Sequence, residues 1–143
     1  MSAADIESIK SDFYRHVCDL QDRITAALLA VDPDCEVTRD RWTRRDAADG
    51  DGGGGDTRAF AGSVIENAGV NTSLIYGEIS ADFAAKLPGS GTTIWATGVS
   101  LIIHPRNPHV PTVHANFRMI EHGDKVWFGG GADLTPYYPH EDD

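Results

Sequence analysis

The feature that most constrains the fold is one long amphipathic segment, followed by a remainder that contains none of comparable length. Between residues 5 and 31, apolar side chains recur at steps of three and four, which places them on one stripe of a helix. The stripe consists of Ile6, Ile9, Phe13, Val17, Leu20, Ile24, Leu28 and Val31. No alternation of helices and strands follows, which disfavours a parallel sheet with crossover helices. The sequence predicts an α+β fold, in which helices cover an antiparallel sheet behind an N-terminal amphipathic helix.

Short segments with a period of two follow Pro33 and indicate about six strands. Residues 1–143 are expected to form a single domain, and because the chain ends without a closing element we expect that domain to be incomplete. The expected segments are a strand over 36–44, a loop over 46–57, strands over 58–67 and 72–79 around a turn at 68–71, a short helix over 80–87, a strand over 92–103 with a bulge or close approach at Gly98, a proline-rich irregular stretch over 104–111, and hairpin strands over 112–121 and 125–129.

The charge is strongly negative and unevenly distributed. The net charge is −10, which disfavours general nucleic-acid binding because phosphate contacts require clustered Lys and Arg. Residues 83–120 contain no Asp or Glu and carry a charge of +3, whereas the rest of the chain carries −13. The basic stretch is typical either of a local anion site or of buried strands with incidental arginines. The excess of Asp over Lys is typical of a salt-adapted surface, but a GC-rich genome gives a similar bias.

Localisation and redox state follow from what the sequence lacks. No apolar run approaches the roughly 20 residues of a membrane-spanning helix, and the acidic N-terminus does not resemble a secretory signal. Cys18 and Cys35 fit no metal-binding spacing and are expected to be free thiols. We therefore expect a cytoplasmic protein with no membrane span.

The densest cluster of reactive side chains lies between residues 100 and 118. On a strand, His114, Asn116 and Arg118 point to the same face. Such a polar row is either exposed to solvent or forms the floor of a pocket. Arginine binds carboxylates through its planar fork, and histidine can exchange protons near neutral pH. The preceding segment adds Ser100, His104, Arg106 and Asn107.

The same cluster leaves a metal site open as an alternative. His104 and His114 could ligate a divalent metal, although two histidines ten residues apart are a weak signal. A metal-dependent hydrolase that uses both histidines with Asp133 is therefore a competing interpretation.

Two glycine clusters complete the candidates. Residues 52–55 are four consecutive glycines, but no Lys-Ser or Lys-Thr follows, so they do not form a phosphate loop. Either a flexible connector or a close approach to a ligand explains them. Asp133 follows the second cluster, where it either caps a turn or is a buried carboxylate that accepts N–H groups of a ligand.

Together these stretches resemble the oxygen-dependent coproporphyrinogen oxidases. The matching strings are GGGGDTRAF, ENAGVNTSLIYG, GVSLIIHPRNPHVPTVHANFR and WFGGGADLTPYY, in the order of the family. The resemblance covers most of the chain from Trp42 onward and corresponds to the first half of the family's domain. It implies conversion of coproporphyrinogen III to protoporphyrinogen IX with dioxygen as co-substrate, without flavin or haem. It also implies a broad antiparallel sheet with helices on both sides, and a homodimer.

The resemblance assigns roles to individual residues. It makes His114 the proton donor, gives substrate contacts to Ser100 and to the stretch Asn116, Phe117, Arg118, and implicates Asp133 in holding pyrrole N–H groups. His104 and His114 match histidines that could bind a divalent metal. Arg106 is expected to join the carboxylate-binding set, and His114, Arg118 and Asp133 should face one cavity. A noncatalytic tetrapyrrole-binding module is the further alternative.

Overall fold

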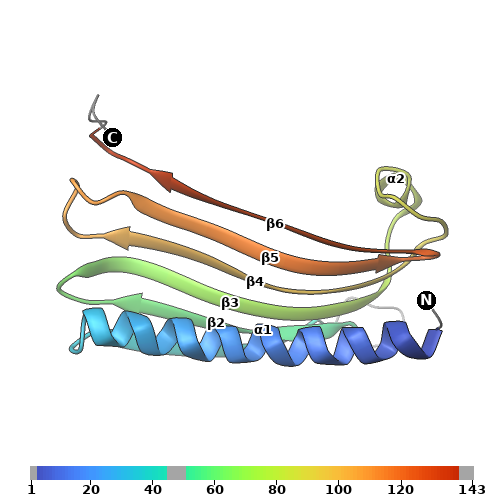
Figure 1. The fold of residues 1–143 in the computed structure, drawn as a ribbon, viewed down its shortest axis with the longest axis horizontal. Coiled ribbons are helices and arrows are strands. Elements are labelled where there is room, and N and C mark those ends of the chain that lie inside the picture. Colours follow the sequence, from blue (N-terminus) through green and yellow to red (C-terminus); the bar gives the residue numbers. More distant parts are fainter. Residues whose placement is uncertain (1–2, 45–50, 139–143) are drawn as a thin grey trace.

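The fold is an antiparallel sheet with one long helix on one face. The computed structural model describes residues 3–44 and 51–138, which form a six-stranded sheet in the order β1-β2-β3-β4-β5-β6 (Figure 1). Each strand pairs with its neighbour in sequence, so the sheet is a simple meander. The strands are β1 (Glu36–Thr43), β2 (Gly53–Ala61), β3 (Ile65–Glu78), β4 (Thr93–Pro105), β5 (Thr112–His122) and β6 (Lys125–Thr135). In the described part of the chain, no helix has the length and apolar character needed to cross a membrane.

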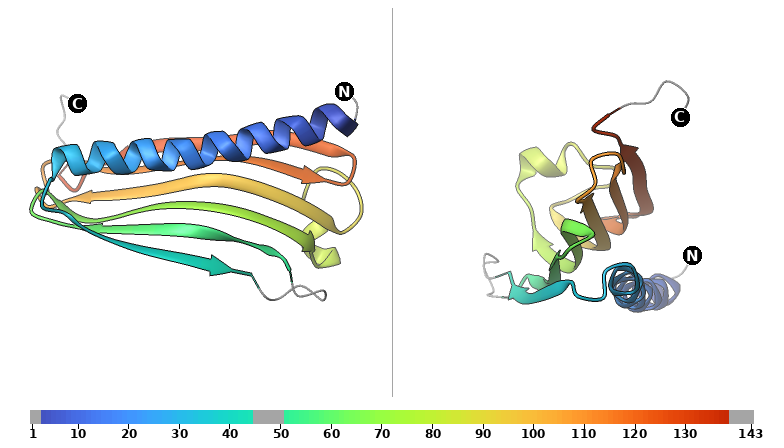
Figure 2. Two further views of the ribbon diagram at one scale, coloured as in Figure 1. Left: turned by 90° about the horizontal axis from the view of Figure 1, so that it is seen from below. Right: turned by 90° about the vertical axis from the view of Figure 1, so that its left-hand side faces the viewer.

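Helix α1 (Ala3–Val31) lies along the strands and covers one face of the sheet (Figure 2, left). Val17 and Leu28 of its stripe are buried against Phe60, Val70 and Val99. The predicted apolar stripe is thus confirmed at its centre, but Val31 remains 60% exposed because it lies at the last turn. Gln21 is buried in the same contact, where its Nε2 donates to the carbonyls of two strands.

The predicted turn at residues 68–71 is wrong. These residues lie inside β3, which pairs with β2 on one side and β4 on the other. The chain turns instead at residues 62–64, where the amide of Gly62 donates to the carbonyl of Ile65. Asp32, buried at the end of α1, accepts hydrogen bonds from the backbone N–H groups of Val64 and Ile65. A carboxylate from a distant segment therefore closes this turn.

Both glycine clusters lie in strands, except for Gly52, which precedes β2. Gly53 begins β2 with φ of +88°, and a Cβ there would approach the carbonyl oxygen of Leu74 to 2.0 Å. The predicted loop over 46–57 is therefore wrong from residue 53 onward, and residues 46–50 lie outside the described part. Strand β6 likewise continues through the second cluster to Thr135, six residues beyond the predicted end. The backbone of these glycines joins the hydrogen-bonded ladder, which their composition did not indicate.

The remaining elements lie close to their predicted positions. Helix α2 (Ala81–Ala84) is shorter than the expected segment and begins after Ser80, whose side chain accepts from the N–H of Phe83. Strand β4 passes Gly98 without a bulge and extends to Pro105, so the irregular stretch predicted over 104–111 is wrong for its first two residues. The hairpin turns at Gly123, whose φ is +58°.

The predicted α+β class holds, but the expected cover by helices is present on one face only. In the described residues α1 packs on one face, and α2 lies at one end of the sheet (Figure 1). We call the face opposite α1 the open face. It is the face on which the candidate site lies.

Candidate active site

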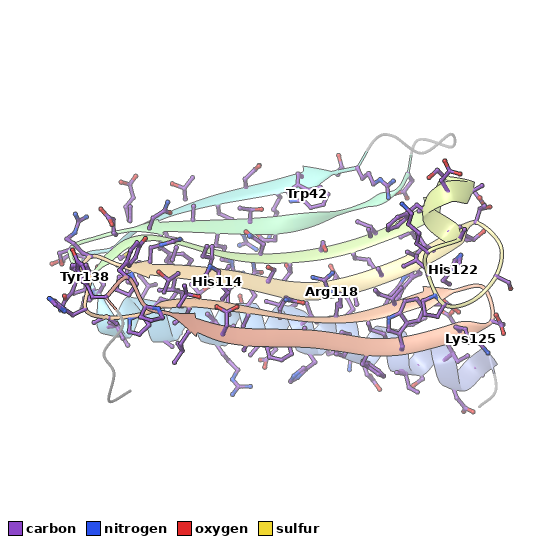
Figure 3. All side chains as sticks on the ribbon, turned by 90° about the horizontal axis from the view of Figure 1, so that it is seen from above. Trp42, His114, Arg118, His122, Lys125 and Tyr138 are labelled. Carbon is purple, nitrogen blue, oxygen red and sulfur yellow. The ribbon has the colours of Figure 1, made fainter. Side chains whose placement is uncertain are left out.

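The predicted polar side chains meet on the open face because of strand register. His114, Asn116 and Arg118 of β5 point to this face, away from α1, as Figure 3 shows for His114 and Arg118. Ser100 pairs with Asn116, and His104 lies four residues further along β4, on the same face. Asp133 of β6 pairs directly with His114. The expectation that these groups share one face is therefore met.

His114 and Asp133 form a hydrogen-bonded pair. The imidazole Nδ1 lies 2.8 Å from the carboxylate Oδ1, and the hydroxyl of Thr135 donates to the same oxygen at 3.0 Å. A carboxylate only accepts, so the proton of this bond lies on Nδ1, and a neutral ring keeps Nε2 as its acceptor. The His114 hydrogen bond, and after it the Thr135 bond, lower the pKa of Asp133 below its usual range. The pair can hold the imidazole in one orientation for proton exchange.

Asp133 occupies neither of its two expected positions. It lies in a strand rather than capping a turn, and its side chain is 62% exposed rather than buried. Its Oδ1 already has two donors, whereas its Oδ2 accepts none from the described residues. One carboxylate oxygen therefore orients His114, and the other is open to N–H groups of a ligand.

Arg118 presents a guanidinium that is not engaged within the fold. Its side chain is exposed, and it makes no hydrogen bond or ion pair with the described residues. Its strand partner is Gly98, where a Cβ would approach that of Arg118 to 2.9 Å. Gly98 thus lets the two strands lie close without crowding the base of the arginine side chain.

Arg118 and Ser100 border a hollow of about 520 Å³ on the open face. Residues from β1 to β5 and from α2 line it. The open-face residues of this lining are Trp42, Thr57, Asn71, Ser73, Ile75, Phe83, Ile94, Ala96, Gly98, Ser100, Arg118 and Ile120. Among the described residues the lining has one cation and no carboxylate, so it suits an anionic ligand with an apolar portion.

Sequence reasoning missed the contribution of β2 and β3 to this hollow. Asn71 pairs with Ser100, and Ser73 pairs with Gly98. The amide oxygen of Asn71 is buried and has no hydrogen-bond partner among the described residues. Asn71 and Ser73 stand two residues apart and so share one face of a strand, but the turn wrongly placed at 68–71 broke the strand that carries them.

Trp42 forms a wall of the hollow by lying over Gly55. The two residues pair across β1 and β2, and a Cβ on Gly55 would come within 2.7 Å of two atoms of the indole ring. The glycine run therefore makes room for an aromatic side chain of the protein itself. The close approach that the run suggested is to Trp42.

Two of the predicted substrate-contacting residues differ from the expectation: Arg106 lies away from the hollow, and Phe117 borders the hollow but points to the other face. The guanidinium of Arg106 donates through Nε and Nη2 to the carbonyl of Gly62, at 3.3 and 2.9 Å, beyond the end of β4. Phe117 alternates with its two neighbours and points to the α1 face, where its strand partner Val99 belongs to the core. Sequence adjacency grouped these residues with the site, but a turn contact holds Arg106 away from it, and strand parity turns the side chain of Phe117 from the open face.

The described residues do not by themselves make a metal centre. The rings of His104 and His114 meet edge to face with centroids 6.3 Å apart. The Nδ1 of His104 lies 3.3 Å from the hydroxyl of Thr112 and 3.4 Å from that of Tyr137. No cluster of three His, Cys, Asp or Glu side chains suited to a metal occurs in the described ranges. The arrangement does not fit the three-ligand set proposed for a hydrolase.

The expectation of one cavity for His114, Arg118 and Asp133 is met in part. All three side chains lie on the open face, but the hollow includes Arg118 and not the other two. From Arg118 to His114 the strand advances four residues, about 13 Å. An extended ligand could contact the hollow and the His114–Asp133 pair at the same time.

Comparisons with known proteins agree with these motifs. The family model described as coproporphyrinogen III oxidase matches residues 12–143. A protein of Prochlorococcus marinus (strain MIT 9515) named oxygen-dependent coproporphyrinogen-III oxidase is 45% identical over 127 residues, which are 87% of this chain and 36% of that protein. A protein of the same name from Synechococcus sp. (strain CC9605) is 45% identical over 130 residues, covering 89% of this chain and 34% of the relative.

This chain therefore spans about a third of the length of the curated relatives that it matches, rather than the half that the resemblance suggested. The matched region nevertheless contains every candidate site residue, from Trp42 to Asp133, that the open face brings together. On the match over residues 12–143, the chain belongs to the coproporphyrinogen III oxidase family.

Proposed function

We propose that this chain provides part of the active site of an oxygen-dependent coproporphyrinogen oxidase. The reaction converts two propionates of coproporphyrinogen III to vinyl groups and yields protoporphyrinogen IX. For each propionate, one dioxygen is consumed, and one carbon dioxide and one hydrogen peroxide leave. The observation that carries the proposal is the His114–Asp133 pair, which lies on the same sheet face as the unpaired Arg118.

The side chains have separate tasks in this proposal. Arg118 binds a substrate carboxylate through its guanidinium fork, and Ser100 and Asn116 supply hydrogen bonds beside it. His114 exchanges a proton through Nε2 while Asp133 holds its Nδ1. The second oxygen of Asp133 accepts pyrrole N–H groups. An electron-rich pyrrole can itself react with dioxygen, so the redox step needs no flavin or haem, unlike most oxidations.

A chimera tests the proposal, because the chain covers only part of its relatives. The matched segment of the Prochlorococcus marinus protein is replaced by this chain, and oxygen consumption is measured with coproporphyrinogen III in the dark. We expect oxygen uptake with equimolar release of carbon dioxide, and no product under anaerobic conditions. Binding of the substrate without oxygen uptake would support the noncatalytic binding module instead. Loss of turnover when metal ions are removed with a chelator would support the alternative in which His104 and His114 bind a divalent metal.

Three further features stay predictions from the sequence. We propose a homodimer for the chain of full family length, a cytoplasmic location, and a single domain over residues 1–143. Light scattering of the chimera measures its oligomeric state, and a monomer that retains turnover would contradict the dimer.

A further inference from the structure

The hollow beside Arg118 has an organisation that the proposed function does not use. Cross-strand pairing divides the open face into rows. The row of Ile75, Ala96 and Ile120, here called the apolar row, lies on the α2 side of Arg118. The next row contains Ser73, Gly98 and Arg118, and the third contains Asn71, Ser100 and Asn116. Adjacent rows lie about 7 Å apart along each strand.

The apolar row is closed at one end by α2 and the residues beside it. Phe83 of α2 and Ile94 of β4 line the hollow together with the apolar row. Phe83 is 49% exposed, so an apolar side chain stands over the hollow rather than packing into the core. No carboxylate or cation of the described residues lies in this part of the lining.

A ligand that fits this arrangement carries a carboxylate beside an uncharged substituent. Its carboxylate binds Arg118 and the hydroxyl and amide groups of the third row. Its apolar substituent lies on the other side of Arg118, against the apolar row. A charged group there would lose its hydration without gaining a partner. Each pyrrole ring of coproporphyrinogen III has this pattern, because a propionate and a methyl group occupy adjacent carbons.

We propose that the apolar row, with Phe83 and Ile94, is a specificity subsite for a methyl substituent of the tetrapyrrole. The inference rests on the proposed function and adds to it the feature by which the site rejects tetrapyrroles that carry acetate in place of methyl. The subsite lies on the far side of Arg118 from His114. It therefore holds a ring other than the one whose propionate reacts.

Paired ligands test this subsite in the 143-residue chain. Binding of coproporphyrinogen III and of uroporphyrinogen III, which has acetates where the former has methyls, is measured anaerobically by equilibrium dialysis. Salt of about 0.5 M screens the general repulsion between eight carboxylates and an acidic protein. We expect at least about tenfold tighter binding of coproporphyrinogen III.

Charged variants locate the discrimination in the apolar row. Ala96→Lys places a cation in the hollow and should remove the preference or reverse it, by strengthening the binding of uroporphyrinogen III. Ala59→Lys is the matched control, because Ala59 is an exposed open-face residue of β2 outside the hollow. It should keep the preference of the unmodified chain. If Ala96→Lys does not fold, Phe83→Lys makes the same test at an exposed position.

The outcomes separate this inference from the proposed function. Absence of any coproporphyrinogen III binding would overturn the proposed function, and the subsite with it. Equal binding of both ligands, or equal shifts in the Ala96→Lys and Ala59→Lys chains, would overturn the subsite and leave the proposed function standing.

Discussion

The smallest functional unit of this molecule is the pair that His114 and Asp133 form across two strands. A histidine on an exposed sheet face can rotate, but a carboxylate on Nδ1 fixes both the ring and its tautomer. Replacement of Asp133 by Asn keeps the volume and removes the charge. We expect the chimera to lose turnover by about 100-fold or more, because the imidazole is no longer held with Nε2 as acceptor.

The pair also has a spectroscopic signature that a merely structural role would not produce. Nitrogen NMR of the 143-residue chain should show the proton of neutral His114 on Nδ1, and Asp133→Asn should change that tautomer distribution. Thr135→Val removes the second donor to the same oxygen and should leave the tautomer unchanged. An unchanged tautomer and near-native turnover in Asp133→Asn would contradict the role given to Asp133.

Arg118 is the residue on which carboxylate binding depends. It lies on the open face without a partner in the described residues, so it needs no internal bond to break before it binds an anion. Arg118→Ala should weaken the binding of coproporphyrinogen III by about tenfold or more, which corresponds to one charge-assisted hydrogen bond. Arg118→Lys should recover part of the loss because it restores the charge but not the fork.

Arg41→Ala is the control for this prediction. Arg41 is an exposed arginine of β1 whose pairing with Asp56 places it on the α1 face. Its removal changes the net charge by the same amount, and equilibrium dialysis should show binding within about twofold of the unmodified chain. Equal losses in the two variants would assign the effect to net charge rather than to Arg118.

At the scale of elements, the sequence predicted periodic segments well and glycine-containing strands poorly. Helix α1 was predicted almost to the residue, because its apolar stripe is long and regular. Gly69 was interpreted as part of a turn because glycine is common in turns. Strand β3 nevertheless continues through Gly69, because β2 and β4 pair with it on both sides. The true turn depends on Asp32, some 30 residues away, and no local pattern reports such a contact.

Asp32 joins the end of α1 to the turn between β2 and β3. Its carboxylate accepts the Val64 and Ile65 amides at 2.8 and 3.0 Å, and the Ser63 hydroxyl at 3.2 Å. Asp32→Asn keeps one acceptor oxygen for the two amides but removes the negative charge that strengthens these hydrogen bonds, and it replaces the oxygen that accepts from Ser63 by a donor. We expect the midpoint of thermal unfolding at pH 7 to fall by an amount on the order of 5 °C or more.

The same contact predicts a pH dependence. The backbone hydrogen bonds of Ile65 and Val64 lower the pKa of Asp32 from the ordinary value of 3.8. The stabilisation is therefore complete above the ordinary pKa and is lost as the pH falls through the lower pKa of the folded state. Urea unfolding should show the difference between the natural chain and Asp32→Asn shrinking below about pH 4. A difference that grows with acidity would contradict the contact.

Gln21 connects α1 to the strands that it covers. Its Nε2 donates to the carbonyls of Asp56 and Val70, and its Oε1 accepts from the hydroxyl of Thr72. Gln21→Leu keeps the volume and leaves buried polar groups without a partner. We expect a loss of about 1–3 kcal/mol in the free energy of unfolding, measured with urea.

A double-mutant cycle separates the hydrogen bond from packing. Thr72→Val removes the hydroxyl, so the cost of Gln21→Leu should be smaller in that background than in the natural chain. Strict additivity of the two losses would show that Gln21 and Thr72 are not coupled.

At the scale of the whole molecule, the sequence predicted the chemistry of the site but not its extent. Alternation along β5 placed His114, Asn116 and Arg118 on one face, which the structure confirms. The side chains from β1 to β3 that complete the hollow became apparent only from the order of the strands. That order follows from the packing of the sheet as a whole.

The basic stretch over 83–120 has a related explanation. Its bases do not form one site, because Lys86 follows α2, Arg106 binds the Gly62 carbonyl at the end of β4, and Arg118 lies between them along the sheet. The stretch contains the paired strands β4 and β5, as the second interpretation expected, and anion binding by Arg118 stays a prediction.

The acidic surface makes the last prediction one about salt. The chain has 22 acids and 12 bases, and exposed acids lie along the outer face of α1. Simple screening of their repulsion is nearly complete by a few tenths molar, where the Debye length is only about 5 Å. A salt-adapted surface should instead keep gaining stability into the molar range. We expect the urea midpoint to rise between low and multimolar potassium chloride, and Asp34→Lys, which reduces the net negative charge by two units, to reduce this rise. Equal stability in both conditions would eliminate salt adaptation and leave the acidic composition without a role in folding.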